Sequence, residues 1–554
     1  MKRIVLTLMA ALTLGLTASA QTPMLLSDNH AMLRLKQTER YLLLPVQEKE
    51  EMAALAVLDE RNEVVKRLNV RLAVDKVDYF VPLEIGRGKL LDITFHGDRR
   101  TKGAMKDFAC WRDMKPASTF DKQNRERFRP LYHHTPQYGW MNDPNGMFYK
   151  DGVWHLYYQW NPYGSQWENM TWGHSTTRDL IHWEAQPTAI EADGLGAIFS
   201  GSCVTDGDRV VAFYTSAAAA QTQSMAVSTD GGKTFKKHAG NPVLTSNAPD
   251  FRDPKVFWNE QAKMWNMVLA VGQEMRIFSS KNLTDWKHES SFGKEYGNHG
   301  GVWECPDLFP LTNGQTTKWV LLCNINPGGP FGGSATQYFI GDFDGHKFTC
   351  ESMPKVTKWL DYGKDHYATV SFYNAPENRR VVLAWMSNWQ YANQVPTKQF
   401  RSANSIARDL GLFKDGEETY VSVVPSKEMD AVRGGKLKKL TEACEVVIDL
   451  KGTADITLQN TKGEQVTMHY DAQKQEFQMD RTKSGDTSFS EAFPCVTTAP
   501  THGQMKQLRL FIDRCSMEAF ASDGRMAMTN LVFPSEPYTE LKVKGGKATI
   551  YEIR

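Results

Sequence analysis

The stretch GMFYKDGVWHLYYQW, residues 146–160, has the composition of a β-hairpin. An apolar strand leads into the polar turn Lys150-Asp151-Gly152, and a second strand rich in aromatic residues follows. Short apolar runs separated by a turn that contains Gly or Asp are typical of two antiparallel strands. The same arrangement recurs in IFSGSCVTDGDRVVAFYTS (198–216), DPKVFWNEQAKMWNMVLAVG (253–272), CPDLFPLTNGQTTKWVLLCNIN (305–326) and YATVSFYNAPENRRVVLAWMS (367–387).

A second pattern follows most of these hairpins. A strand leads into a polar turn that contains Asp and ends at Trp or Phe, as in GHSTTRDLIHW (173–183), AVSTDGGKTF (226–235), FSSKNLTDW (278–286) and IGDFDGHKF (340–348). The combined unit repeats at roughly 50–60 residues with four strands, which is the spacing of β-propeller blades. We therefore predict an all-β, five-bladed propeller over residues 128–414. The alternative is a large β-sandwich whose segments are similar by chance.

The flanks of the repeat predict two further β domains and a leader. Residues 21–127 contain strand-like runs such as RYLLLPV and YFVPLEI, and we expect an extra small N-terminal β domain there. Residues 415–554 alternate between apolar and polar positions, as in EVVIDL and ATIYEIR, which predicts a C-terminal β-sandwich. The chain begins with positively charged residues, continues with an apolar run and then has the small residues Ala18-Ser19-Ala20, a pattern that predicts a signal peptide over residues 1–20. We therefore expect an exported protein, periplasmic or secreted, without a membrane anchor.

The composition narrows the class of protein. Hydrophobic residues make up 41% of the chain and charged residues 23%, which is ordinary for a soluble globular protein. The net charge is +1 and no long basic block is present, so we expect no nucleic-acid partner. The 15 Trp and 19 Tyr suit either a large β-rich core or stacking on sugar rings. The 8 cysteines are scattered without metal-binding spacing, and we expect them to be mostly free and buried.

The sequence WMNDPNG (140–146) combines turn residues with large apolar ones. Asn142 to Gly146 predicts a turn, because Asn and Gly tolerate unusual backbone angles and Pro fixes φ. Trp140 and Met141 seek burial. We therefore expect a turn that presents the carboxylate of Asp143 in an apolar setting.

Acidic residues occupy corresponding positions in three of the repeated units. Asp143 opens the first, Asp253 opens the third and Glu304 opens the fourth, each beside or near a proline. The first strand of each propeller blade lines the central channel, and the segments that lead into these strands gather at one end of it. We therefore expect the three carboxylates to converge. The alternative for each acid is a local turn-capping role, as is common for Asp before Pro.

Carboxylates on both sides of a bond are the groups that glycoside hydrolysis requires, one as ionised nucleophile and one as proton donor. Arg252 is expected to hold its neighbour Asp253 ionised or to bind a sugar hydroxyl. An apolar sugar-binding wall is expected from four tryptophans close to these acids in sequence, Trp140, Trp167, Trp172 and Trp303.

Three boxes, WMNDPNG, FRDPKV and WECPD, resemble the signature of glycoside hydrolase family 32, which contains invertases, inulinases, levanases and other β-fructosidases. RPLYHHTPQYGWMNDPNG, YYQWNP, FSGS (199–202), GKDHYA (363–368) and FIDRCSMEAFASDGR also match the family. The resemblance covers about residues 128–554 and does not extend to residues 21–127.

The resemblance implies a propeller followed by a sandwich and a retaining mechanism on terminal β-fructofuranosyl groups. It implies that Asp143 is the nucleophile, that Glu304 is the acid/base and that Asp253 stabilises the transition state. It also implies that fructose is held by Asn142, Gln159, Trp167, Phe199, Ser200, Arg252 and Trp389. No metal and no organic cofactor are expected, because the two carboxylates carry out every proton and group transfer.

The favoured function is a bacterial fructan β-fructosidase that acts on an oligo- or polysaccharide as a monomer or weak homo-oligomer. The stretch WMSNWQYANQVPT (385–397) is more similar to exo-acting inulinases and levanases than to plant invertases. The alternatives are a sucrose-preferring invertase or a fructosyltransferase. A non-catalytic carbohydrate-binding propeller is a more distant alternative, because all three acids are present.

Overall fold

The computed structural model describes residues 22–36, 38–97, 104–122 and 125–554. The expected signal peptide, residues 1–20, therefore lies outside the described residues. The chain divides after Asp121 into two compact units. No helix in the described ranges is long and apolar enough to cross a membrane.

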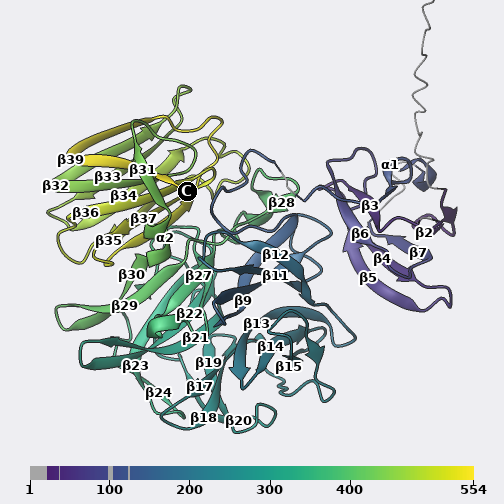
Figure 1. Cartoon of the computed structure of the whole chain (residues 1–554), viewed down its shortest axis with the longest axis horizontal. Helices are drawn as coiled ribbons and strands as arrows, with labels where there is room; N and C mark the ends of the chain where they lie inside the picture. Colours follow the sequence, from purple (N-terminus) through teal and green to yellow (C-terminus); the bar gives the residue numbers. More distant parts are fainter. Residues whose placement is uncertain (1–21, 37, 98–103, 123–124) are drawn as a thin grey trace, which may run out of the picture. The chain divides into compact units, whose positions relative to one another are not determined.

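The first unit contains two antiparallel sheets, one with the strand order β1-β2-β7-β4-β5 and one with the order β6-β3-β8 (purple to dark blue in Figure 1). Buried and partly exposed side chains alternate along β7, because successive residues of a strand point to opposite faces. The expected N-terminal β domain is therefore present. Its elements are β1 (Met24–Leu25), β2 (His30–Arg34), β3 (Tyr41–Val46), β4 (Ala53–Leu58), β5 (Val64–Val70), β6 (Tyr79–Glu84), β7 (Leu90–Phe95), η2 (Met105–Asp107), α1 (Ala109–Asp113) and β8 (Lys115–Ala117).

The second unit begins with five sheets, each built mainly of consecutive antiparallel strands. The first three blades are β9 (Gly139–Lys150), β10 (Val153–Asn161), β11 (Thr171–Thr177) and β12 (Glu184–Ile190); β13 (Ala197–Asp206), β14 (Arg209–Ala217), β15 (Gln221–Ser228) and β16 (Lys236–Lys237); and β17 (Phe251–Asn259), β18 (Met264–Val271), β19 (Glu274–Ser280) and β20 (Lys287–Phe292). The fourth has β21 (Val302–Asn313), β22 (Thr316–Asn326), β23 (Ala335–Phe343), β24 (Phe348–Cys350) and β25 (Lys358–Trp359). The fifth has β26 (Tyr367–Ser371), β27 (Val381–Trp385), β29 (Arg408–Asp415) and β30 (Glu418–Pro425).

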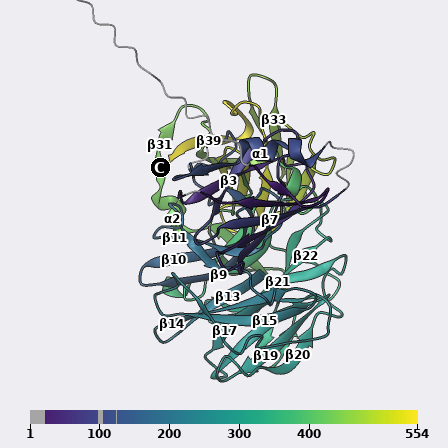
Figure 2. The same cartoon turned by 90° about the vertical axis from the view of Figure 1, so that its right-hand side faces the viewer.

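The first strands of the five blades form a closed ring. β9 contacts β13, β13 contacts β17, β17 contacts β21, β21 contacts β26, and β26 returns to β9. Figure 2 shows β9, β13 and β17 following one another through the lower part of the molecule. The short strand β28 (Phe400–Arg401) pairs in parallel with β9. The fold is thus the predicted five-bladed propeller.

The fifth blade extends to Pro425, whereas the sequence places the end of the propeller at residue 414. The polar segment around Gly416 reads as a domain boundary, but it is the turn between β29 and β30, which pair from Arg408 with Pro425 to Asp415 with Glu418. A hairpin turn and a linker have similar compositions, so the sequence pattern alone does not separate them.

The C-terminal part is a β-sandwich whose strands are drawn in yellow-green and yellow in Figure 1. Strands β33 and β34 alternate between buried and partly exposed residues, so each presents one face to an apolar core that includes Val446, Leu458 and Met479. α2 (Lys427–Ala431) leads into β31 (Arg433–Leu437), β32 (Cys444–Gln459), β33 (Gln465–Asp471), β34 (Glu476–Lys483), β35 (Val496–Pro500), β36 (Gln507–Asp513), β37 (Ser516–Ala521), β38 (Ala527–Leu531) and β39 (Glu540–Ile553).

Buried charges join the propeller to the sandwich. His133 precedes the first blade, and its Nδ1 and Nε2 lie 2.8 and 2.7 Å from the carboxylates of Asp513 and Glu518 of the sandwich. Ionised carboxylates only accept hydrogen bonds, so both ring nitrogens donate and the imidazole is charged. Burial opposes the charge, but these two acceptors raise the pKa of His133 to about 9. Arg408 of β29 binds Glu518 as well, which extends the network.

All eight cysteines lie in the described residues and are free, and six of them are buried. The expectation of mostly free, buried thiols is confirmed.

Candidate active site

Each of the five innermost strands carries an irregularity at the same place. The register with the second strand of the blade shifts there, so that two residues of the inner strand face one residue of its partner, and β9 has a further shift of the same kind at Gly146-Met147. Such β-bulges redirect side chains and are common beside active sites. The bulged pairs are Asn142-Asp143, Phe199-Ser200, Asp253-Pro254, Cys305-Pro306 and Ala368-Thr369.

The bulge corrects the expectation of a turn at residues 142–146. These residues lie within the continuous strand β9 (Gly139–Lys150). Asn, Pro and Gly are used there for the irregular step of a bulge rather than for a chain reversal. Asp253 and Cys305 have φ angles of 64° and 43°, a region that side chains other than Gly rarely adopt, so their backbones are strained where the acids are placed.

The three predicted acids are brought together around one residue, Cys305. Its Sγ lies 3.3 Å from Oδ2 of Asp143 and 3.6 Å from Oδ2 of Asp253, and its backbone N–H donates to Asp253 at 2.9 Å. Glu304 is its neighbour in sequence. Residues separated by more than 160 positions therefore meet at one end of the ring of strands.

Asp143 accepts two hydrogen bonds from predicted site residues. Ser200 Oγ donates to Oδ2 at 2.6 Å, and Asn142 Nδ2 donates to Oδ1 at 3.1 Å. Asn142 is itself held by Trp140, whose Nε1 donates to the amide oxygen at 2.8 Å. These contacts fix the orientation of the carboxylate.

Glu304 lies between a cation and a hydroxyl group. Arg252 donates from Nη2 to Oε1 at 2.9 Å, and the hydroxyl of Tyr367 donates to Oε2. Burial raises the pKa of Glu304 above its ordinary value, and this effect exceeds the lowering by Arg252 and by the hydrogen bond from Tyr367.

Of the two roles predicted for Arg252, the ion pair with Asp253 is not formed, whereas the binding of a sugar hydroxyl stays a prediction. Arg252 forms ion pairs with Glu304 and, at 2.7 Å, with Asp250, rather than with its neighbour Asp253. The pKa of Asp253 is raised to about 7. Burial is the main cause, and the negative charges of Glu304 and Asp143 add to it, whereas the charge of Arg252 lowers the pKa by less. Consecutive residues of a strand point to opposite faces, so adjacency in sequence does not make an ion pair.

The predicted tryptophan wall is correct only in part. Trp172 and Trp303 are fully buried in the cores of blades, and Trp140 is also fully buried. Trp167 alone of the four is exposed, at 40%, and its ring meets that of Phe199 edge to face at 5.9 Å. A tryptophan next to a channel-facing acid points away from the channel, which explains the burial of Trp303 beside Glu304.

The two remaining substrate-contact candidates lie against the same strands. The ring of Trp389 stacks on Trp140 at 5.8 Å and lies 4.7 Å from Trp385. Gln159 is buried opposite the bulge of β9. With the side-chain amide of Asn145 flipped so that its oxygen and its nitrogen both have partners, Nε2 of Gln159 donates to the Asn145 oxygen at 2.9 Å. All seven candidates thus belong to, or pack against, the bulged strands.

Cys305 and Tyr367 were not predicted as site residues. Tyr367 lies in the family motif GKDHYA and Cys305 in the family motif WECPD. Both motifs therefore pointed to the site, but neither of these side chains was assigned a role from the sequence. In the described part of the chain, no group of three or more His, Cys, Asp or Glu side chains is arranged to hold a metal ion.

Comparison with known sequences assigns the family. Residues 133–423 match the N-terminal domain of the glycosyl hydrolases family 32, and residues 416–554 match its C-terminal domain. The chain belongs to glycosyl hydrolase family 32. Residues 27–132 match DUF4980, a domain of unknown function.

Individual members of family 32 are also similar over most of their length. The levanase of Bacillus subtilis (strain 168) is 43% identical over 466 residues, which cover 76% of this chain and 68% of the levanase. The extracellular exo-inulinase of Aspergillus niger is 36% identical over 76% of this chain and 93% of its own length. The crystal structure of exo-inulinase from Aspergillus awamori superposes with a TM-score of 0.72 at 34% identity, over 78% of this chain and 99% of that one. This family 32 protein is therefore a glycosidase of the β-fructofuranosidase type.

Proposed function

We propose that this family 32 enzyme is an exported, exo-acting fructan β-fructosidase that releases terminal β-D-fructofuranosyl residues with retention of configuration. The observation that carries the proposal is the pairing of an oriented Asp143 with a partly buried Glu304 of raised pKa, joined through Cys305. A fixed carboxylate and a proton-holding carboxyl are the two groups that a retaining glycosidase needs. The levanase and exo-inulinase relatives support fructan as the substrate class.

In the first half of the proposed reaction, a carboxylate oxygen of Asp143 attacks the anomeric carbon of the terminal fructose. The bond from that carbon to the glycosidic oxygen breaks, and Glu304 gives its proton to the departing oxygen. Ser200 and Asn142 hold Asp143 in the attacking orientation. The product of this step is a fructosyl ester on Asp143.

In the second half, the ionised Glu304 takes a proton from a water molecule, whose oxygen attacks the same carbon. The ester bond to Asp143 breaks, and fructose leaves with its original configuration. Arg252 favours the ionised form of Glu304 at this stage, whereas burial favours the protonated form needed earlier. One side chain can thus serve first as acid and then as base.

Asp253 has a separate role in the proposal. Its carboxyl accepts the backbone N–H of Cys305 and is not needed as nucleophile or proton donor. It is placed to accept hydrogen bonds from fructose hydroxyls while positive charge develops on the ring. Such bonds strengthen in the transition state and therefore act mainly on kcat.

Exo action and export complete the proposal. The acids lie on a closed ring of inner strands, so a chain end reaches Asp143 more readily than the middle of a polymer. The predicted signal peptide supports export, and the exo-inulinase relatives that are described as extracellular are consistent with it. A sucrose-preferring invertase is the second candidate, because an invertase of Debaryomyces hansenii is 46% identical over 53% of this chain.

Sugar release from levan, inulin and sucrose tests the proposal directly. We expect free fructose as the only early product from both polymers, and we expect Asp143→Asn to abolish it. A ladder of short oligofructosides at low conversion would contradict exo action. Activity confined to sucrose would favour the invertase, and no release from any of the three would refute the β-fructosidase assignment.

A further inference from the structure

The segment 361–365, which leads into β26, lies along β38 of the sandwich. The backbone N–H of Asp365 donates to the backbone oxygen of Thr529 at 3.1 Å. Gly363 permits this close approach, because a Cβ at that position would lie 1.9 Å from the same oxygen. The sandwich therefore holds the chain two residues before Tyr367, whose hydroxyl donates to the predicted acid/base.

A tight turn from Asn388 to Ala392 carries Trp389, the tryptophan predicted to contact the sugar. The backbone N–H groups of Tyr391 and Ala392 both donate to the oxygen of Asn388, at 3.1 and 2.9 Å. The side-chain amide of Asn388 donates to the backbone oxygen of Lys364 at 2.9 Å. The turn is therefore tied to the same segment that leads into β26.

A buried network joins the turn and the segment to β34 of the sandwich. The hydroxyl of Tyr391 donates to Oδ1 of Asp365 at 2.5 Å. Arg481 of β34 donates from Nη1 to Oδ2 of Asp365 at 2.5 Å and from Nη2 to the hydroxyl oxygen of Tyr391 at 2.8 Å. All three side chains are at most 1% exposed. One guanidinium of the sandwich thus holds two groups that lie beside active-site residues in the chain.

The network is better suited to fixing geometry than to adding stability. Desolvation offsets most of the attraction within a buried ion pair, so such a pair stabilises a fold little more than apolar side chains of the same volume. A planar guanidinium, however, presents its donors in fixed directions. Arg481 uses them on Asp365, on Tyr391 and on the backbone oxygens of Phe493 and Leu531, at 2.8 and 3.0 Å.

We propose that the buried network of Arg481, Asp365 and Tyr391 positions active-site groups for the reaction. Through it, the sandwich places Tyr367 beside the acid/base and Trp389 in the fructose site. The inference rests on the proposed function, because that function assigns the acid/base and the fructose site. The C-terminal sandwich then takes part in catalysis without contributing a side chain that touches the substrate.

The pH dependence of activity reports where the hydroxyl of Tyr367 lies, since this hydroxyl lowers the pKa of Glu304. None of the other charged or titratable groups that face Glu304 forms a hydrogen bond or an ion pair with the network in the described part of the chain. These groups are Arg252 and Asp253 of β17, Asp143 of β9, and the thiols of Cys305 and Cys323. A change in the network therefore reaches Glu304 through Tyr367.

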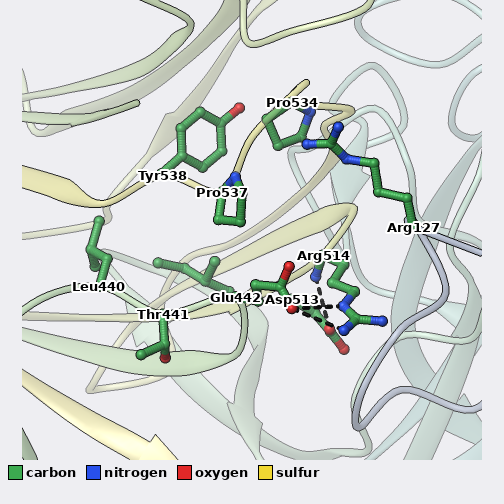
Figure 3. A pocket seen from close by; sticks show the side chains of 10 residues that line it. Arg127, Leu440, Thr441, Glu442, Asp513, Arg514, Pro534, Pro537 and Tyr538 are labelled. Atoms are coloured by element: carbon green, nitrogen blue, oxygen red, sulfur yellow. Dashed lines mark hydrogen bonds and ion pairs between the residues drawn. The ribbon is translucent and has the colours of Figure 1, made fainter. Parts of the chain in front are cut away.

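The test uses the full-length enzyme with Tyr391→Phe, which removes one hydroxyl and leaves the ion pair of Arg481 with Asp365 in place. The matched control is Tyr538→Phe, because Tyr538 is another buried tyrosine whose hydroxyl donates to a backbone oxygen of the sandwich. Figure 3 shows Tyr538 beside a small pocket with no active-site residue among the side chains that line it. The pH profile of kcat/KM, the KM for sucrose and the unfolding temperature are measured for each variant, for Tyr367→Phe and for the double variant.

We expect Tyr391→Phe to move the alkaline limb of kcat/KM to higher pH, in the same direction as Tyr367→Phe but by less. Its KM for sucrose should rise about 2- to 5-fold, because the turn with Trp389 is less firmly held. The double variant should shift no further than Tyr367→Phe alone, since both changes act on one hydrogen bond. Arg481→Lys keeps the charge but loses the fork of donors, so it should show the same changes more strongly. Tyr538→Phe should leave the profile and KM in place.

Tyr391→Phe with an unmoved alkaline limb and only a lower unfolding temperature would show a structural role and overturn the inference. A shift in the double variant equal to the sum of the two single shifts would overturn it as well, because the two residues would then act independently. Absence of fructose release by the unmodified enzyme would instead refute the proposed function.

Discussion

Nη2 of Arg252 donates to Oε1 of Glu304 at 2.9 Å, across the boundary between the third and fourth blades. Tyr367 of the fifth blade donates to the other oxygen of the same carboxylate. Both groups lower the pKa of Glu304, and burial raises it by more than they lower it. The proton affinity of this residue is thus set by side chains from two other blades, and removal of either donor should raise it.

Tyr367→Phe tests this balance. Loss of the hydrogen bond raises the pKa of Glu304 further, so the protonated form persists to higher pH. We expect the alkaline limb of kcat/KM to move to higher pH, with roughly a tenfold loss of activity at the optimum. Tyr214→Phe, which removes the hydroxyl of a buried tyrosine in the second blade, is the control and should leave the profile in place. A limb that moves to lower pH would contradict the assigned balance.

Glu304→Ala tests the role of proton donor. We expect the loss to be largest with fructans and sucrose, whose leaving groups need a proton, and smallest with activated aryl fructosides, whose leaving groups do not. The ratio of kcat/KM between the two substrate classes is the measurement. Equal losses on both classes would show that Glu304 is not the acid.

Asp143→Ala should lose activity on every substrate, because no fructosyl ester can form. We expect a loss of several orders of magnitude with activated and unactivated substrates alike. Ser200→Ala removes one hydrogen bond to Asp143 and should cost only about 10- to 100-fold, so it separates misorientation from loss of the nucleophile. Substantial turnover of aryl fructosides by Asp143→Ala would exclude covalent catalysis at this residue.

Asp253→Asn should lower kcat by roughly 10²–10⁴, or about 3–5 kcal/mol of barrier, with a modest change in KM. The variant removes the negative charge that would stabilise the positive charge developing on the fructose ring. Because the pKa of Asp253 is about 7 in the free protein, bound substrate has to favour its ionised form at lower pH. The intermediate should still form at Asp143, and mass spectrometry of trapped enzyme can locate it. A fructosyl group on Asp253 would exchange the two roles.

The stability of the enzyme should fall with rising pH through His133. Its pKa is about 9 in the folded protein and about 6.5 in an unfolded chain. A group whose folded pKa is raised contributes its full stabilisation below the unfolded value and loses it as pH rises through the folded one. We therefore expect the unfolding temperature to fall between about pH 6.5 and 9, through the loss of a contribution on the order of a few kcal/mol.

His133→Gln serves as the comparison, since it keeps a hydrogen-bonding side chain without a titratable group. Its unfolding temperature should be lower at pH 6 and should change much less across the same range. Parallel pH profiles for the two proteins, followed by calorimetry, would show that His133 does not carry the effect.

The sequence by itself determined the repeat and the chemistry. Hairpins at regular spacing predicted five blades, because each blade must bury its faces against the next. The positions of Asp143, Asp253 and Glu304 in that repeat predicted that they meet. The family boxes supplied Ser200 and Asn142, which the structure places on Asp143.

Only the tertiary structure decided which groups face one another. A strand exposes neighbours in sequence to opposite sides, and a bulge changes that direction within one residue. Arg252 therefore pairs with Glu304 rather than Asp253, and Trp303 enters the core while Glu304 faces the channel. Contacts between individual side chains of different blades depend on the closure of the whole ring and on the face that each side chain takes, and a local sequence pattern gives neither.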